Sequence, residues 1–414
     1  MSAPISSYVS QERLWHRHEQ LALIGATATG GVNRQALSPE DVAACLQLVE
    51  WGQALGMQAS RDAAGNVFLT LPGSDADAAP VLTGSHLDSQ PTGGKYDGVY
   101  GVLAALEACE AIRAAGLTPR RRIEVVAWMN EEGSRFAPGM MGSAVFAGVR
   151  RLADIEAVQD AQGVRVGSAL REAAEALSAI PLRPLGRDVF GYVEAHIEQG
   201  PLLERLGKTI GVVTGIQGKR TFQVQVQGEA AHAGTSTRAE RRDALMAAVA
   251  MVGALNVRMH DELDVLKFTI GRFSVVPNAP SVVPSGVMFS IDLRHPESAV
   301  LLELGDAIEA ICKANAGPCD VSVKELSKAM SLEFPADMRK RIRDSSNALG
   351  ISHMDILSTA GHDARYVHEV CPSAMVFIPC HKGITHNEEE SITAQDAAAG
   401  AKVLTEVLVG LALS

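Results

Sequence analysis

Apolar and polar positions follow two different periods along the first half of the chain. Short apolar runs, typical of buried strands, occupy residues 79–85, 123–129 and 191–197. Residues 98–115 instead place apolar side chains three and four positions apart, as a helix does. Strands that alternate with helices in this way predict an α/β sheet with helices on both faces.

The pattern changes in the middle of the chain. Residues 221–227 alternate strictly, with Phe222, Val224 and Val226 against glutamines, which predicts a strand with one exposed face. The elements around this strand follow the order β-α-β-β-α-β, which is typical of a compact ferredoxin-like unit. The other predicted elements of the unit are a helix at 239–260, strands at 266–276 and 287–294, a helix at 296–314 and a strand at 320–325.

The two patterns together predict two domains. At 414 residues the chain is longer than one hydrophobic core usually supports. The first pattern resumes after about Pro335, so the middle unit is an insertion. We expect a catalytic α/β domain at 1–215 and 330–414, and an inserted ferredoxin-like domain at 216–329. A half-exposed sheet offers an open face or edge for pairing, so we expect the insert to serve as a lid and to form a homodimer.

Composition narrows the classes of partner and compartment. The formal net charge of −11 argues against a nucleic-acid partner, because phosphate binding needs clustered Lys and Arg. The first 20 residues hold no apolar core of a signal peptide, and no run of 18 apolar residues occurs, so we expect neither secretion nor a membrane span. The six scattered cysteines form no C-x-x-C pair, which suits a reducing cytoplasm, the location we expect.

Candidate chemistry begins at the end of the first apolar strand. His86 and Asp88 lie two positions apart, so their side chains leave the same face, and Asp88 is placed to accept the second ring N–H of a metal-binding His86. Asp97 follows a glycine-rich turn at the mouth of the next helix, where a carboxylate is favoured and can bridge two cations. Alone, a His-x-Asp segment is more often a surface turn.

Three further segments add polar groups at strand ends. Glu131 and Glu132 follow an apolar strand at the edge where α/β sheets place their sites. We expect Glu132 to bind metal and Glu131 to take a proton from a metal-held water. His196 lies between two glutamates on a strand, and His386 lies in a loop. Mixed histidine and carboxylate ligands suit two divalent cations, Zn²⁺ or Mn²⁺, Co²⁺ or Ni²⁺. The expected ligands are His86, Asp97, Glu132, His196 and His386.

The sequence resembles the M20 group of two-metal amidohydrolases and peptidases, in particular its hydantoinase/carbamoylase branch. That branch includes N-carbamoyl-L-amino-acid hydrolases, β-ureidopropionase and allantoate amidohydrolase. Each matching stretch is weak alone, but their ordered combination over residues 84–390 is highly specific. The stretches are GSHLDSQPTGGKYDGVYG, NEEGSRF, EAHIEQGP, GEAAHAGTSTRAERRDAL, VPNAP, DLRH, AGHDA and THNEEE.

The resemblance implies how the five ligands divide between the two ions. Asp97 would bridge them. Glu132 and His386 would complete one metal site, and His86 and His196 would complete the other. Peptidases of the wider group usually carry an acidic residue where this chain has His196. The position therefore points away from peptide cleavage and toward ureido or carbamoyl substrates.

The resemblance also implies which groups act on the substrate. Glu131 would be the general base, and His232 would stabilise the oxyanion, either in its own subunit or in the second subunit of a dimer. Asn278 and Arg294 resemble a substrate-binding pair, and a guanidinium can hold a carboxylate bidentately. The other expected substrate contacts are Gln199 and Gly361, with His362 and Asp363 positioning the substrate loop.

The expected activity is hydrolysis of the linear amide C–N bond of an N-carbamoyl amino acid, which releases the amino acid, ammonia and CO₂. Allantoate amidohydrolase is the nearest alternative, because its substrate offers the same carboxylate to Arg294. His196 disfavours an aminoacylase or dipeptidase. The complete ligand set with Glu131 disfavours a non-catalytic binding protein of the same fold. The native metal and the preferred side chain stay open.

Overall fold

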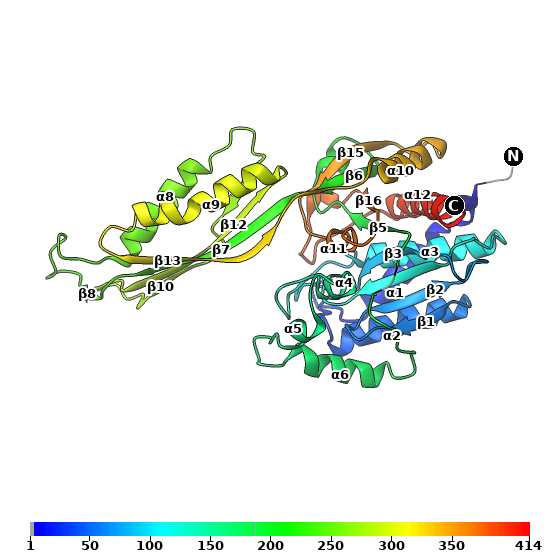
Figure 1. The fold of residues 1–414 in the computed structure, drawn as a ribbon, viewed down its shortest axis with the longest axis horizontal. Helices are drawn as coiled ribbons and strands as arrows, with labels where there is room; N and C mark the ends of the chain where they lie inside the picture. The colour runs from blue at the N-terminus through cyan, green and yellow to red at the C-terminus, as the bar shows by residue number, and fades with distance from the viewer. Residues whose placement is uncertain (1–3, 187) are drawn as a thin grey trace. The chain divides into compact units, whose positions relative to one another are not determined.

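The computed structural model describes residues 4–186 and 188–414, and it divides into two compact units. The first unit comprises Met1–Thr214 and Phe334–Ser414, and the second comprises Gly215–Glu333 (Figure 1). The second unit is therefore inserted into the first along the chain. Among the described residues, no helix has both the length and the apolar character that a membrane span requires.

The first unit is built on a nine-stranded mixed sheet. Its central strands pair in parallel and are fully buried, which explains why their sequences read as continuous apolar runs. The strands in sheet order are β1 (Gln58–Arg61), β2 (Val67–Leu71), β4 (Ile123–Trp128), β3 (Val81–His86), β5 (Gly191–Ile197), β16 (Ser373–Ile378), β6 (Ile210–Ile216) and β14 (Leu332–Glu333), with β15 (His353–Ser358) paired to β6.

Helices cover both faces of this sheet, as alternate residues of β4 show. Val125 belongs to the core that includes α3 (Val99–Ala114) and α12 (Ala394–Ala412). Trp128, on the opposite face, contacts Phe146 of α4 (Met141–Phe146) with ring centroids 5.1 Å apart. The other helices are η1 (Ile5–Tyr8), α1 (Gln11–Ala22), α2 (Pro39–Ala54), α5 (Leu152–Glu156), α6 (Val166–Ala176), α7 (Leu202–Arg205), α10 (Ala336–Ala348), α11 (Ala364–Val367) and η2 (His381–Gly383).

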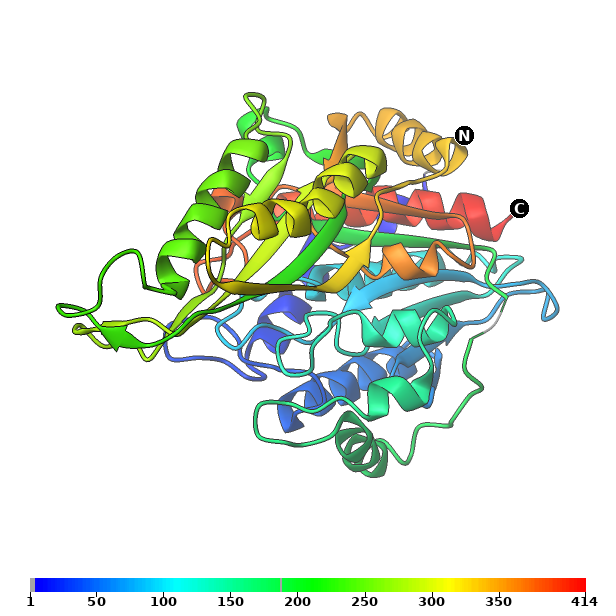
Figure 2. The ribbon, with the colours of Figure 1, turned by 60° about the vertical axis from the view of Figure 1, so that its left-hand side comes forward.

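The second unit is an antiparallel sheet with two helices packed on one face, as Figure 2 shows. The sheet order is β10-β12-β7-β13, with β9 paired to β12. Buried and exposed residues alternate along β7, as the sequence predicted. The elements are β7 (Gly218–Gln227), α8 (Ala244–Arg258), β9 (Lys267–Thr269), β10 (Phe273–Val276), β12 (Gly286–His295), α9 (Ser298–Ala314) and β13 (Asp320–Ala329), with a separate pair β8 (Ala231–His232) and β11 (Val282–Val283).

Three boundaries in this unit differ from the prediction. The strand expected at 266–276 is two short strands, β9 and β10, interrupted around Gly271. The helix expected from residue 239 begins at Ala244, because Asp243 caps it by accepting the amides of Leu245 and Met246. The last strand continues past residue 325 to Ala329, across an irregularity in its pairing with β7.

Candidate metal centre

The five expected ligands of the first unit gather where its central strands end. His86 is the last residue of β3, and His196 is the last but one of β5. Glu132 follows β4, and Asp97 lies two residues before α3. These strands are neighbours in the sheet, so side chains from distant parts of the sequence meet at one edge. The fifth ligand, His386, reaches them from the loop after β16.

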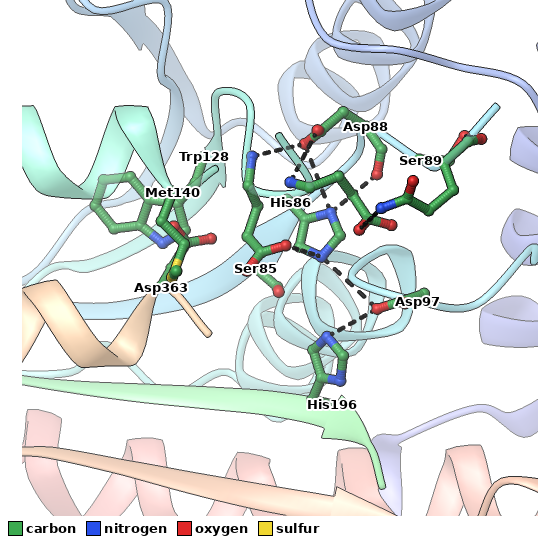
Figure 3. A network of polar contacts seen from close by, with 12 residues as sticks. Ser85, His86, Asp88, Ser89, Asp97, Trp128, Met140, His196 and Asp363 are labelled. Atoms are coloured by element: carbon green, nitrogen blue, oxygen red, sulfur yellow. Dashed lines mark hydrogen bonds and ion pairs between the residues drawn. The ribbon is translucent and has the colours of Figure 1, made fainter. Parts of the chain in front are cut away.

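One donor set comprises His86, Asp97 and His196, all of them buried. The Nε2 atom of His196 lies 3.1 Å from Asp97 Oδ1, and the Nε2 atom of His86 lies 3.7 Å from the same oxygen. Figure 3 shows Asp97 between the two rings. Two imidazole nitrogens and one carboxylate oxygen therefore converge on a small volume.

The other donor set comprises Asp97, Glu132 and His386. Here the Nε2 atom of His386 lies 3.2 Å from Asp97 Oδ2 and 3.3 Å from Glu132 Oε2. Asp97 thus turns one carboxylate oxygen toward each set. This is the arrangement that a carboxylate bridging two cations requires.

Backbone carbonyls fix the orientation of both buried histidine rings. The Nδ1 atom of His86 lies 2.9 Å from the carbonyl oxygen of Asp88, and the Nδ1 atom of His196 lies 2.9 Å from that of Ile197. A carbonyl can only accept, so each Nδ1 carries the hydrogen. In the neutral ring the lone pair of each Nε2 is then available to a cation, whereas a protonated His196 donates from Nε2 to Asp97.

The expected role of Asp88 needs a correction. Its carboxylate oxygen Oδ1 lies 3.6 Å from His86 Nδ1, farther than its own backbone carbonyl. The carboxylate instead accepts the backbone N–H groups of Glu131, at 3.1 Å, and Glu132, at 3.2 Å. These two consecutive amides, in the loop after β4, hold the carboxylate more closely than one ring nitrogen does. Asp88 therefore orients His86 through its backbone and the two glutamates through its side chain.

Glu131 lies against the first donor set, with its Oε2 atom 3.5 Å from His86 Nε2. Burial raises the pKa of its carboxyl well above the usual value, and the carboxylates of Asp363 and Glu132 raise it further. A carboxylate with a raised pKa is a stronger base. Its position and its basicity both suit a group that removes a proton from water.

The charges of the pocket fit divalent cations. Burial, and next the charge of Asp97, raise the pKa of Glu132 to about 7. Burial also favours the neutral form of Asp97, but hydrogen bonds from His196 and His386 outweigh this effect and hold its pKa well below the usual range. The pocket therefore concentrates buried carboxylates and oriented imidazoles, the mixed donors that Zn²⁺ and neighbouring first-row ions prefer.

A third cluster, Glu194, His196 and His362, is satisfied by internal hydrogen bonds. Glu194 accepts the hydroxyl of Ser85 at 2.7 Å and the amide of Ala364 at 2.9 Å. The ring of His362 packs edge-on against that of His196, with centroids 4.4 Å apart, and its Nε2 lies 2.9 Å from Ser358 Oγ. Within this cluster, His362 packs against the ring of His196 and so helps to hold that ring in place.

Asp363 also lies behind the centre. Its carboxylate accepts the hydroxyl of Ser143, and its charge acts on Glu131. Both Asp363 and His362 were expected to position a substrate loop. In the structure, the charge of Asp363 raises the pKa of Glu131, and the ring of His362 packs against that of His196.

Gln199 lies at the metal centre itself. Its Nε2 atom donates to Asp97 Oδ2 at 2.8 Å, while its Oε1 atom is buried and has no hydrogen-bond partner among the described residues. Its φ of +57° is in the left-handed region, which costs a non-glycine residue energy and is typical of functional sites. Gly361, the other expected substrate contact of this unit, faces Met140, whose Cε would lie 3.3 Å from a Cβ at that position.

The remaining expected residues, His232, Asn278 and Arg294, belong to the second unit. The exposed His232 accepts the amides of Gly234 and Thr235 at Nδ1, so its neutral ring carries the hydrogen on Nε2. Asn278 is exposed, with a φ of +58°.

Arg294 lies on the open face of the sheet and is paired with a neighbour on its own strand. Its Nε atom donates to Asp292 Oδ1 at 2.8 Å and its Nη2 atom to Oδ2 at 3.3 Å. Lys219 also lies 3.0 Å from Asp292. The guanidinium therefore already holds a carboxylate in the forked geometry expected for a substrate.

Some residues around the centre were not found from the sequence. Gln90 donates to Glu132 Oε2 at 2.7 Å, and Glu390 accepts the amide of Asp97 at 3.0 Å. Glu390 lies within the motif THNEEE, but an acidic run gives no indication of which glutamate is buried.

Comparison with known proteins gives consistent matches over nearly the whole chain. The sequence profile of peptidase family M20/M25/M40 matches residues 82–409. An N-carbamoyl-L-amino-acid amidohydrolase of Rhizobium meliloti is 37% identical over 96% of this chain and 95% of its own length. An allantoate amidohydrolase of Bacillus subtilis is 34% identical over 95% and 96%. The crystal structure of an amidase of the hydantoinase/carbamoylase family from Burkholderia vietnamiensis matches with a TM-score of 0.90 and 41% identity, over 100% of both chains.

Proposed function

Because the chain belongs to peptidase family M20/M25/M40 as one of its amidohydrolases, we propose that it hydrolyses the linear amide C–N bond of a ureido acid, in first place an N-carbamoyl amino acid. The products would be the amino acid, ammonia and CO₂. The observation that carries this proposal is the pair of donor sets that share Asp97, with Glu131 beside them.

Each donor set would hold one divalent cation. His86 and His196 would bind one, Glu132 and His386 the other, and Asp97 would bridge them. Zn²⁺, Mn²⁺, Co²⁺ and Ni²⁺ all suit these donors. When bound, two such cations lower the pKa of a shared water and polarise the carbonyl of the substrate.

The proton is moved by Glu131. Its carboxylate accepts a proton from the water that attacks the ureido carbon, and the protonated carboxyl then gives this proton to the leaving nitrogen. Burial and the neighbouring carboxylates raise its pKa, which strengthens it as a base. The amide of Glu131 is held by Asp88, so the base stays in place between the two transfers.

Substrate recognition would use the residues that the resemblance to the family implies. The buried Oε1 atom of Gln199 can accept an N–H of the ureido group. Gly361 would be a further contact of the substrate. Arg294 would hold the substrate carboxylate in place of Asp292, with Asn278 beside the substrate. The Nε2–H of His232 would stabilise the developing oxyanion, from its own subunit or from the second subunit of a dimer.

Allantoate is the second candidate substrate, favoured by the similarity to the allantoate amidohydrolase of Bacillus subtilis. It also carries a carboxylate for Arg294 to bind. An aminoacylase or dipeptidase and a non-catalytic binding protein find less support, because His196 and Glu131 both fit ureido hydrolysis.

One experiment separates these candidates. Ammonia release is measured from N-carbamoyl-α-amino acids, N-carbamoyl-β-alanine and allantoate, with Zn²⁺, Mn²⁺ and Co²⁺ added separately. We expect turnover of N-carbamoyl amino acids with at least one cation and none after chelation. A folded, metal-saturated protein that hydrolyses none of these compounds would refute the proposed function.

A further inference from the structure

Glu390 is the buried member of the acidic run Glu388–Glu390, and its carboxylate is fully engaged. Its Oε1 atom accepts the backbone N–H groups of Tyr96, at 2.9 Å, and of Asp97, at 3.0 Å. Its Oε2 atom accepts the hydroxyl of Thr385 at 3.0 Å. The side chain is only 3% exposed, whereas the neighbouring Glu389 is exposed. One carboxylate thus joins the turn before α3 to the loop after β16.

The turn is shaped to receive this carboxylate. A Cβ atom at Gly94 would lie 2.1 Å from the carboxyl carbon and from Oε1 of Glu390. The carboxyl group therefore packs directly on the backbone of the turn, in space that any other residue at position 94 would fill.

Thr385 extends the contact to the side chain of Asp97. Its hydroxyl lies 3.0 Å from Glu390 Oε2 and 3.2 Å from Asp97 Oδ2, and Gln199 Nε2 lies 3.3 Å from it. A hydroxyl has only one hydrogen to give. When that hydrogen goes to Glu390, Asp97 Oδ2 accepts only the N–H of Gln199 from these two side chains and keeps its other lone pair for the second donor set.

We propose that Glu390 is a positioning residue of the metal centre, which fixes Asp97 relative to His386. Asp97 and His386 are far apart in the sequence. Asp97 lies in the turn before α3 and His386 in the loop after β16, and Glu390 contacts both segments. The role rests on the two-cation centre proposed above. A buried carboxylate whose acceptors all face ligand-bearing loops fits this role better than that of a general stabiliser of the fold.

Two substitutions distinguish the effect of the length of the side chain at position 390 from the effect of its charge. Glu390→Gln keeps an Oε1 acceptor at the same distance and loses the charge. Glu390→Asp keeps the charge and is shorter by one methylene group, so it cannot reach both loops. Positioning predicts that the glutamine variant retains the centre and the aspartate variant does not. A purely electrostatic role predicts the opposite order.

The test measures cation binding by the full-length protein. Chelator-stripped protein is titrated with Zn²⁺ against a competing chelator, and bound zinc is counted by elemental analysis. Loss of such a supporting residue typically weakens metal binding by about 10- to 100-fold. We expect this loss for the more weakly bound Zn²⁺ of Glu390→Asp and Glu390→Ala, and a change below about 3-fold for Glu390→Gln. Glu389→Ala, the exposed neighbour, is the matched control and should bind like the wild type.

Thermal unfolding of the stripped proteins shows which variants fold. If Glu390→Ala does not fold, the comparison of the Gln and Asp variants still distinguishes a positioning role from an electrostatic one. Two Zn²⁺ ions bound as tightly in folded Glu390→Asp as in the wild type would overturn the proposal, and so would loss of one ion in folded Glu390→Gln. If the wild type binds two ions but hydrolyses no ureido acid, the proposed function fails while the zinc comparison still tests Glu390.

Discussion

At the scale of single residues, Gly98 determines where the ring of His86 lies. Its φ is +66°, and a Cβ atom there would lie 2.4 Å from Nε2 of His86. The ring therefore packs on the bare backbone at the start of α3. Both the left-handed conformation and the close approach require glycine.

The substitution Gly98→Ala should displace the ring of His86 and weaken binding of one cation by at least about 10-fold. Elemental analysis and chelator competition measure the loss. Gly116→Ala is the matched control, because Gly116 has a φ of +69° but a Cβ there would meet no described atom within 4 Å. Equal metal binding by the two variants would show that the contact with His86 has no effect on the centre.

Glu131 and Glu132 are adjacent in the sequence but should respond differently to the same substitution. Glu131→Gln removes the base and leaves both donor sets intact, so kcat should fall by roughly 10²- to 10⁴-fold at unchanged metal content. Glu132→Gln removes a donor and should lower the metal content. The measurement pairs ammonia release with elemental analysis of one sample. Wild-type kcat in metal-loaded Glu131→Gln would exclude the proposed base.

At the scale of elements, the sequence predicts some features well and others poorly. The buried strands β3, β4 and β5 were predicted within two residues of their ends, because strands covered on both faces are continuously apolar. The break between β9 and β10 was missed, since that segment is largely exposed and its apolar residues do not mark a buried face. Side-chain partners of Asp88 were also missed, because spacing shows which face a residue occupies and not which amide it meets.

Helix α1 carries a buried histidine that should make stability depend on pH. His18 packs among Trp15, Tyr96 and Tyr100, and burial lowers its pKa from 6.5 to about 3. The unfolded chain therefore binds a proton below pH 6.5 that the folded chain does not. The stability contribution of neutral His18 is present above pH 6.5 and is lost as the pH falls toward 3.

Between pH 7 and pH 5 this loss amounts to about 2 kcal/mol. Urea unfolding at both values should show that His18→Phe reduces the pH dependence of stability by about this amount. His16→Phe, on the exposed side of the same helix, should leave the pH dependence unchanged. A full pH dependence in His18→Phe would show that His18 is already protonated in the folded protein or has no share in the effect.

At the scale of the whole molecule, the exposed side of helix α8 gives a test of the homodimer expected from the sequence. Between Asp243 and Arg258 this helix has no charged residue, and Met246, Val249 and Val257 are 61%, 51% and 76% exposed. A helix that is apolar on both its inner and outer sides is usually covered on both. We propose that a second copy of this chain covers the outer side of α8.

The substitution Val249→Glu places a charge on this surface and should convert a dimer into a monomer. Light scattering at micromolar concentration measures the mass. Leu23→Glu is the control, because Leu23 is 76% exposed but lies in the first unit. A monomeric wild type, or a Val249→Glu variant that stays dimeric, would contradict the proposed interface.

The candidate site shows the same limits as the fold. All five expected ligands meet at one edge of the first sheet, because parallel strands bring their ends together. The motifs could not show that Arg294 is paired with Asp292, or that Glu390 holds the amide of Asp97. Such contacts depend on which side chains of distant segments become neighbours, and this information lies in the packing.

The central claim is that two cations share the carboxylate of Asp97. The most direct test counts the cations bound per chain, together with ureido hydrolysis, for the wild type and for Asp97→Ala. We predict two cations and ammonia release for the wild type, and at most one cation and no hydrolysis for the folded variant. Two tightly bound cations in Asp97→Ala, or full hydrolysis by a wild type freed of metal, would contradict the claim.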